Sequence, residues 1–132
     1  MKINPETLAP DGSKNLLEAA VLGACLAAPW QFSKVAEVLT PEDFSDRANR
    51  ETYLALLAMH GRGIPSDSVL LTVELRDSNK RSVIEHVGKL LQVGAIGPHL
   101  QFYVEALVQR SAARRKAIEL VESSNTGLRA VE

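Results

Sequence analysis

The stretch from Asn15 to Gly23, N-L-L-E-A-A-V-L-G, predicts the first confident helix of the chain and sets the expectation for its fold. Asn15 can accept hydrogen bonds from N–H groups of the first turn, and Glu18 can reach back to complete a capping box. Small and apolar residues then recur along one helical face, at Leu17, Val21, Ala24, Cys25 and Ala28. Gly23 inside a helix costs about 1 kcal/mol relative to alanine, which indicates close approach of another backbone. The stretch is therefore a packing signal.

Composition limits the possible classes of protein. The 132 residues are 45% hydrophobic, which suits one domain with a small core. The formal net charge is −1, far from the basic excess of a dedicated nucleic-acid module. Cys25 alone cannot form an intramolecular disulfide and is expected to be a small buried hydrophobe. Because no apolar run approaches 18 residues and residues 1–12 do not resemble a signal peptide, we expect a soluble, cytoplasmic protein without membrane contact.

The predicted organisation is all-α, with a compact multi-helix head followed by a long final element. We expect an irregular leader over residues 1–12, a globular helical head over 13–97, a C-terminal helix or helical hairpin over 98–123, and a frayed tail over 124–132. The final element exceeds the usual helix length of ~8–20 residues. It is therefore either one protruding helix or two helices broken near Ser111.

Start and stop signals divide the head. Thr40 precedes Pro41, Glu42 and Asp43, a capping residue followed by proline and acids, which predicts a brief helical turn with Phe44 pointing inward. Ser45 or Asp46 can cap the next helix, which we expect to end at about His60 with Gly61 as its left-handed stop.

The run from Val69 to Leu75, V-L-L-T-V-E-L, is compatible with a buried strand on periodicity alone. We predict a helix, because Asp67 or Ser68 supplies an N-cap and no second strand-like run exists to pair with it. A later stripe of Val83, Ile84, Val87, Leu90 and Leu91 predicts another helix, closed by Gly94.

Motifs for enzyme chemistry are not found in the sequence. It contains no G-x-x-x-x-G-K-[ST] phosphate loop, no G-x-G-x-x-G and no G-x-S-x-G elbow. His60, His86 and His99 are far apart and have no carboxylate or thiol at metal-ligand spacing. We therefore predict no catalytic, cofactor-binding or metal-binding residues.

A basic patch in the final element is the one feature with a functional character. Its members are Arg110, Arg114, Arg115 and Lys116. The patch could meet phosphate or an acidic partner, or it could be a solvated face compensated by nearby glutamates, and the second interpretation is favoured. No aromatic residue interleaves the patch as a stacking platform for single strands requires. We accordingly expect at most weak contact with DNA.

Five short motifs, in order along about 100 residues, resemble the N-terminal domain of the DnaB-type replicative DNA helicase. They are similar to the family's E-x-x-V-L-G opening, its P-E-D-F turn, its H-R-x-I-F pattern, its G-x-P-I-D-x-x-T-L segment and its Y-A-x-I-V…R signature. The matching residues are Glu18, Val21, Leu22 and Gly23; Asp43 and Phe44; Arg50 and Tyr53; Pro65, Asp67 and Leu71; and Tyr103 with Arg114.

The chain also departs from the family pattern. Leu16 and Leu17 replace a more polar start, Asn49 stands where histidine is usual, and Leu70 replaces a threonine. The family's V-G-G-x-x-Y-L segment is shortened, and the RecA-like motor of the helicase is missing from these 132 residues.

The resemblance implies an all-helical domain with a helical head and a C-terminal helical hairpin, which assembles into dimers and, in the full helicase, a trimer-of-dimers collar. In that family the collar docks the C-terminal helicase-binding domain of primase and influences the helicase loader. We therefore expect a non-catalytic oligomerisation and protein-docking domain acting in DNA replication. The candidate interface residues are Leu16, Tyr103, Leu107, Arg110, Arg114 and Ile118. The alternatives are a stand-alone phage or plasmid regulator or loader adaptor that binds a helicase collar, and a weak nucleic-acid binder.

Overall fold

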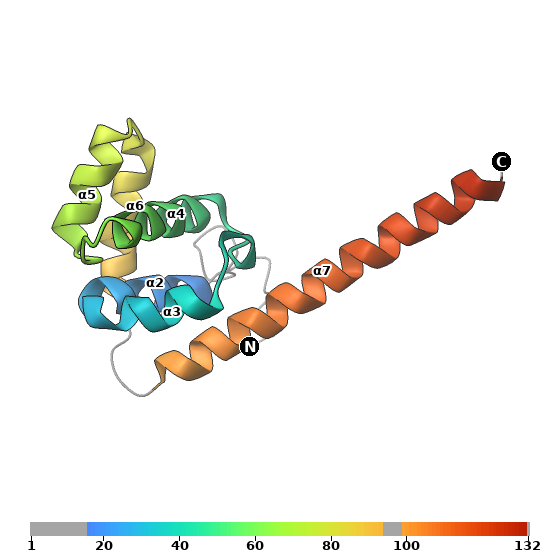
Figure 1. Cartoon of the computed structure of the whole chain (residues 1–132), viewed down its shortest axis with the longest axis horizontal. Helices are drawn as coiled ribbons and strands as arrows, with labels where there is room; N and C mark the ends of the chain where they lie inside the picture. The colour runs from blue at the N-terminus through green and yellow to red at the C-terminus, as the bar shows by residue number, and fades with distance from the viewer. Residues whose placement is uncertain (1–15, 94–98, 132) are drawn as a thin grey trace, which may run out of the picture.

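The computed structural model describes residues 16–93 and 99–131, with side chains up to residue 122 (Figure 1). All regular elements of the described residues are helical, which confirms the all-α class. The elements are α2 (Leu16–Ala27), η3 (Pro29–Gln31), α3 (Phe32–Val38), η4 (Pro41–Asp43), α4 (Arg47–Gly61), α5 (Ser68–Asp77), α6 (Arg81–Val93) and α7 (Leu100–Val131). The predictions for the leader, for Asn15 as a cap and for Gly94 fall outside the described residues.

Helix α2 occupies the centre of the head. It packs against α6 and α7 and also contacts α4, so it lies between the upper helices and the long helix beneath them (Figure 1). All of its residues from Ala20 to Leu26 are buried, including Gly23. Cys25 is fully buried, and the loss of solvent raises the pKa of its thiol to about 12. The packing signal in this stretch is thus confirmed.

An aromatic cluster joins α3, η4 and α4. The Tyr53 ring lies 5.8 Å from the Phe32 ring and 4.6 Å from the Phe44 ring, measured between centroids. Its hydroxyl donates to the Leu39 carbonyl oxygen over 2.7 Å, which satisfies the polar end of a fully buried side chain. Burial raises the pKa of Tyr53. Phe44 points inward as predicted and is completely buried.

The end of α4 differs from the prediction. Gly61 belongs to the helix, and the left-handed residue is Gly63, with φ of +74°. The N–H of Gly63 donates to the His60 oxygen and that of Ile64 to the Met59 oxygen, the two bonds of a Schellman cap. These bonds require the left-handed conformation at Gly63, two positions after the predicted Gly61. At the other end Asp46 caps the helix by accepting from the Asn49 N–H over 2.9 Å.

Two ambiguous segments are helices. Residues Val69–Leu75 lie within α5, whose cap is the Asp67 side chain, which accepts from the N–H groups of Val69 and Leu70. Helix α7 runs without a break through Ser111, so the final element is one protruding helix and not two helices broken near Ser111. Its backbone also stays helical beyond residue 123, where the sequence predicted a tail.

Candidate protein-interaction site

A buried carboxylate fastens α2 to the start of α4. Glu18 is 4% exposed, and its two oxygens accept from the Ser45 N–H (2.9 Å), the Ser45 hydroxyl (2.7 Å), the Asp46 N–H (3.3 Å) and the Asn49 amide (3.0 Å). Free N–H groups at a helix start are natural partners for a carboxylate. Glu18 therefore anchors two helices, a role that the predicted capping box did not include.

Asn49 extends this network to α6. Its amide nitrogen donates to Glu18, so its oxygen is left to accept from His86 Nε2 at 2.5 Å. Burial lowers the pKa of His86, and the charge of Asp46 opposes part of that effect. The residue at which the chain departs from the family's histidine thus bridges α2 and α6.

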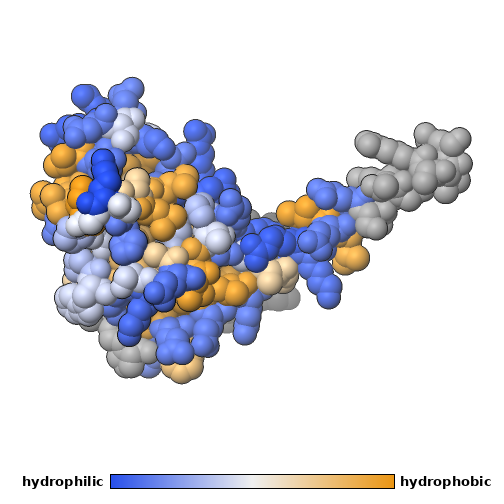
Figure 2. Space-filling model, in the orientation of Figure 1, coloured by the Kyte–Doolittle hydropathy of each residue, from blue (hydrophilic) through white to orange (hydrophobic). Residues whose placement is uncertain are grey.

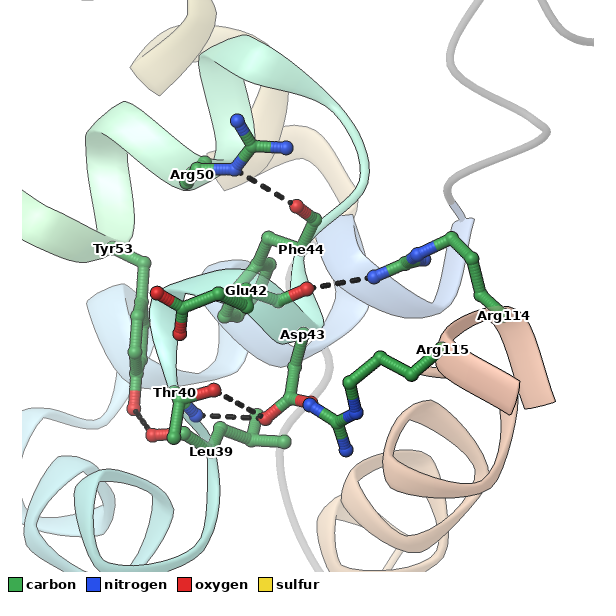
Figure 3. Close-up of polar contacts among 9 residues, drawn as sticks. All are labelled: Leu39, Thr40, Glu42, Asp43, Phe44, Arg50, Tyr53, Arg114 and Arg115. Carbon is green, nitrogen blue, oxygen red and sulfur yellow. Dashed lines mark hydrogen bonds and ion pairs between the residues drawn. The ribbon is translucent and has the colours of Figure 1, made fainter. Parts of the chain in front are cut away.

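A second anchor joins α7 to η4 (Figure 3). Asp43 accepts from the Thr40 N–H at 2.7 Å in the capping box of η4, and its other oxygen lies 3.4 Å from Arg115 Nη1. Arg114 Nη2 donates to the Glu42 carbonyl oxygen over 2.7 Å. We call these contacts of Arg114 and Arg115 the η4 anchor. Half of the predicted basic patch is therefore used within the chain, which neither interpretation of the patch anticipated.

The apolar stripe that packs α7 onto the head continues beyond the anchor. Val104, Leu107 and Ser111 are buried on the face toward the head. The same face, at alternating spacings of three and four, next presents Arg114, Ile118 and Val121. Ile118 is 52% exposed and Val121 60%, on the part of α7 that projects away from the head (Figure 1). We call residues 116–131 the arm.

The candidate interface residues divide by exposure. Leu16, Arg110 and Ile118 are exposed, and Tyr103 and Arg114 are half-buried. Leu107 is 3% exposed and belongs to the core cluster, so within one chain its side chain packs onto the head. The α7 stripe that contains it is buried near the head and exposed farther out.

Several exposed apolar side chains were not identified from the sequence. They include Trp30, Phe102, Val69 and Val73. Helix α5 carried a usable signal, since it has apolar residues around most of its circumference and packing on one side buries only Leu71 and Leu75. Figure 2 shows hydrophobic residues gathered at the α5 end of the head and again on the arm.

The described residues offer neither a metal-binding cluster nor a single membrane-spanning helix. In residues 16–93 and 99–131 no group of three or more His, Cys, Asp or Glu side chains is placed to hold a metal ion. No individual helix there is long and apolar enough to span a membrane. The pair Leu16–Ala27 and Pro29–Val38 has a sufficient combined length and composition, but it is bent by 116° and α2 is mostly buried in the core.

The geometry defines an all-helical head-and-arm domain with unpaired apolar surface on its arm. A family model described as the DnaB-like helicase N terminal domain matches residues 13–109. The chain belongs to this family, and the resemblance drawn from its motifs is confirmed.

Two replicative helicases illustrate the relationship in sequence. The chain is 33% identical over 101 residues to the replicative DNA helicase DnaB of Geobacillus stearothermophilus, covering 74% of this chain and 22% of that protein. It is 30% identical over 101 residues to the replicative DNA helicase DnaC of Bacillus subtilis, with the same shares covered. The chain thus spans about a fifth of the length of these curated relatives.

Two solved structures share the fold. The crystal structure of the N-terminal domain of DnaB helicase from Mycobacterium tuberculosis matches with a TM-score of 0.82 at 25% identity, covering 89% of this chain and 86% of that one. The N-terminal domain of DnaB helicase from Helicobacter pylori, described with its interactions with primase, matches with a TM-score of 0.68 at 18% identity, covering 96% and 98%. The second likeness concerns the fold alone.

Proposed function

We propose that this chain is a non-catalytic oligomerisation and protein-docking domain of a bacterial replicative DNA helicase, acting in the cytoplasm. The observation that carries the proposal is the arm, where Ile118, Leu120 and Val121 are more than half exposed on a projecting helix. Burying an aliphatic side chain fully is worth about 1.5–3 kcal/mol, so covering this surface favours association with another protein surface. The sequence contains no phosphate loop, which supports a role separate from ATP hydrolysis.

The proposed partners are a second copy of the chain and a replication protein. Membership in the DnaB N-terminal family supports self-association in a collar. The H. pylori structure is described with primase, which supports the C-terminal helicase-binding domain of primase as the docked partner, with the helicase loader as the alternative.

The arm can be tested by one substitution. Ile118→Asp places a charge on the exposed stripe, so it should raise the dissociation constant for self-association at least ~10-fold without changing the helical signal. Ala117→Asp is the matched control, because Ala117 is also exposed but lies off the stripe. Sedimentation velocity over a concentration series measures both.

Two results would end the proposal. One is a wild-type chain that stays monomeric at high concentration and does not bind the C-terminal domain of primase. The other is equal association of Ile118→Asp and the wild type, which would exclude the arm as the self-association surface.

Binding to nucleic acid is a weaker candidate. The η4 anchor occupies Arg114 and Arg115, which leaves Arg110 and Lys116 as the exposed cations of the patch without a hydrogen bond or ion pair within the described residues. Two phosphate contacts would give only a shallow dependence of affinity on salt.

A further inference from the structure

Ser111 is the exception among the buried polar side chains of the described residues. It is fully buried on the face of α7 that packs onto the head, and its hydroxyl forms no hydrogen bond with any described residue. The other buried polar side chains there, which are Glu18, Asp43, Asn49, Thr52 and Ser66, all have partners. A buried donor without an acceptor is unfavourable and rare in folded proteins. The observed position of α7 therefore carries a free-energy cost at Ser111.

A hydroxyl inside a helix has an acceptor close by in the carbonyl group four residues earlier. Thr52 donates to the Ala48 oxygen in this way over 2.8 Å, and Thr72 makes the same kind of bond in α5. Ser111 makes no such bond to Leu107. Because a bond of this kind often bends a helix, forming it would turn the distal part of α7 away from its observed straight course (Figure 1).

Ser111 also lies at the point where α7 leaves the head. On its N-terminal side Val104 and Leu107 are buried in the core cluster. On its C-terminal side the η4 anchor ties α7 to the head (Figure 3). From residue 115 to residue 122 every side chain is exposed. A change of direction at Ser111 would thus move the arm and leave the core contacts of α7 in place.

Two opposing contributions act at this junction. Release of α7 from the head would give the Ser111 hydroxyl access to water or to a carbonyl acceptor, which favours the released position. The η4 anchor favours the docked position through the 2.7 Å bond from Arg114 and the ion pair of Arg115. That ion pair is weak, because the Arg115 side chain is half-exposed. Since neither contribution is large, the two positions differ little in free energy.

We propose that α7 has a hinge at Ser111, and that the η4 anchor is its latch. In the docked position, which the structure shows, the latch is closed and the Ser111 hydroxyl has no partner. In the released position the latch is open and the hydroxyl is paired. The inference goes beyond the proposed function, because it concerns the direction of the arm and does not depend on which partner the arm meets.

The hinge can be followed by the distance between two spin labels on the full chain, measured by double electron–electron resonance. Ala58→Cys places one label at an exposed position of α4, and Ala117→Cys places the other on the arm. Cys25 is fully buried and should remain unlabelled. Dilution with unlabelled chain suppresses distances between copies. The doubly labelled chain should give two distances, one for the docked arm and one for the released arm.

The substitutions should shift these two populations in opposite directions. Ser111→Ala removes the unpaired hydroxyl, so it should raise the ratio of docked to released chains ~5-fold or more. Arg114→Ala/Arg115→Ala opens the latch and should lower the same ratio ~3-fold or more. Ala112→Ser is the matched control, because it adds a hydroxyl at the neighbouring, exposed position of the same helix and should leave the ratio unchanged.

The direction of each shift decides the outcome. A distance distribution that Ser111→Ala leaves unchanged, or shifts toward the released arm, would overturn the hinge. A shift of similar size with Ala112→Ser would assign the effect to helix propensity and would also overturn it. Circular dichroism and the Tm of each variant establish that it is folded. Since the measurement reports a distance within one chain, its result is separate from that of the self-association test.

Discussion

At the scale of single residues, two polar side chains hold the head together from inside. Glu18 joins α2 to α4, and Asn49 joins that pair to α6. Buried polar groups stabilise a fold only while each has its partners, because an unpaired buried donor costs ~1–3 kcal/mol. The network therefore makes the packing of three helices depend on a few atoms.

Replacing Glu18 by alanine should lower the free energy of unfolding by about 3 kcal/mol, because several buried donors lose one acceptor. Glu18→Gln should cost less, since the amide oxygen can still accept. Urea unfolding at neutral pH measures both, with exposed Glu37→Ala as the control. A loss no larger than that of the control would show that the network contributes little.

His86 should make stability depend on pH. Its pKa is lower in the folded chain than in the unfolded chain, mainly through burial, so the unfolded state binds more protons as the pH falls. The stabilisation is complete above the ordinary histidine pKa and is lost as the pH falls through the lowered folded value. Chemical unfolding from pH 7.5 to 5 should show a smaller decline for His86→Gln, whose amide can still donate to Asn49. Equal declines in the two proteins would contradict the linkage.

At the scale of elements, the η4 anchor fixes where α7 leaves the head. Arg114 and Arg115, whose contacts with η4 form this anchor, lie directly before the arm. The Arg115 side chain is 51% exposed, so its ion pair with Asp43 adds little to the stability of the fold. The anchor therefore acts mainly on the direction in which the arm leaves the head.

The double variant Arg114→Ala/Arg115→Ala should therefore loosen α7 more than it destabilises the head. We expect faster amide hydrogen exchange after Ser111 and a loss of no more than ~1 kcal/mol in unfolding free energy. Arg110→Ala/Lys116→Ala is the matched control, because it removes two exposed cations that form no hydrogen bond or ion pair within the described residues. Identical exchange in the two double variants would exclude the anchor.

At the scale of the whole molecule, local patterns predicted the elements and failed at contacts between distant segments. Periodicity was sufficient for α2 and capping residues for α5, because those signals act within a few residues. In G-R-G (residues 61–63) either glycine could end α4, and the hydrogen bonds of the helix end select the second. Arg114 meets Glu42 across 72 positions, and nothing in the local sequence of α7 indicates that contact.

In the candidate site too, local sequence patterns were informative about single residues but not about contacts between distant segments. The exposed end of the α7 stripe was recognisable at Ile118, but the stripe gave no sign that Leu107 is covered by the head. The apolar groove that Val69, Val73, Val87 and Leu91 line depends on how α5 and α6 pack, so neither helix alone could predict it.

The complete burial of Cys25 in α2 has a practical consequence for labelling experiments on the arm. A thiol with a pKa of about 12 is almost entirely protonated at neutral pH, and the protonated form is a poor nucleophile. A maleimide probe should thus label a cysteine introduced on the arm and spare the native one. Slow modification of Cys25 in the same sample then records each opening of α2, so one reagent follows arm placement and core unfolding on separate timescales.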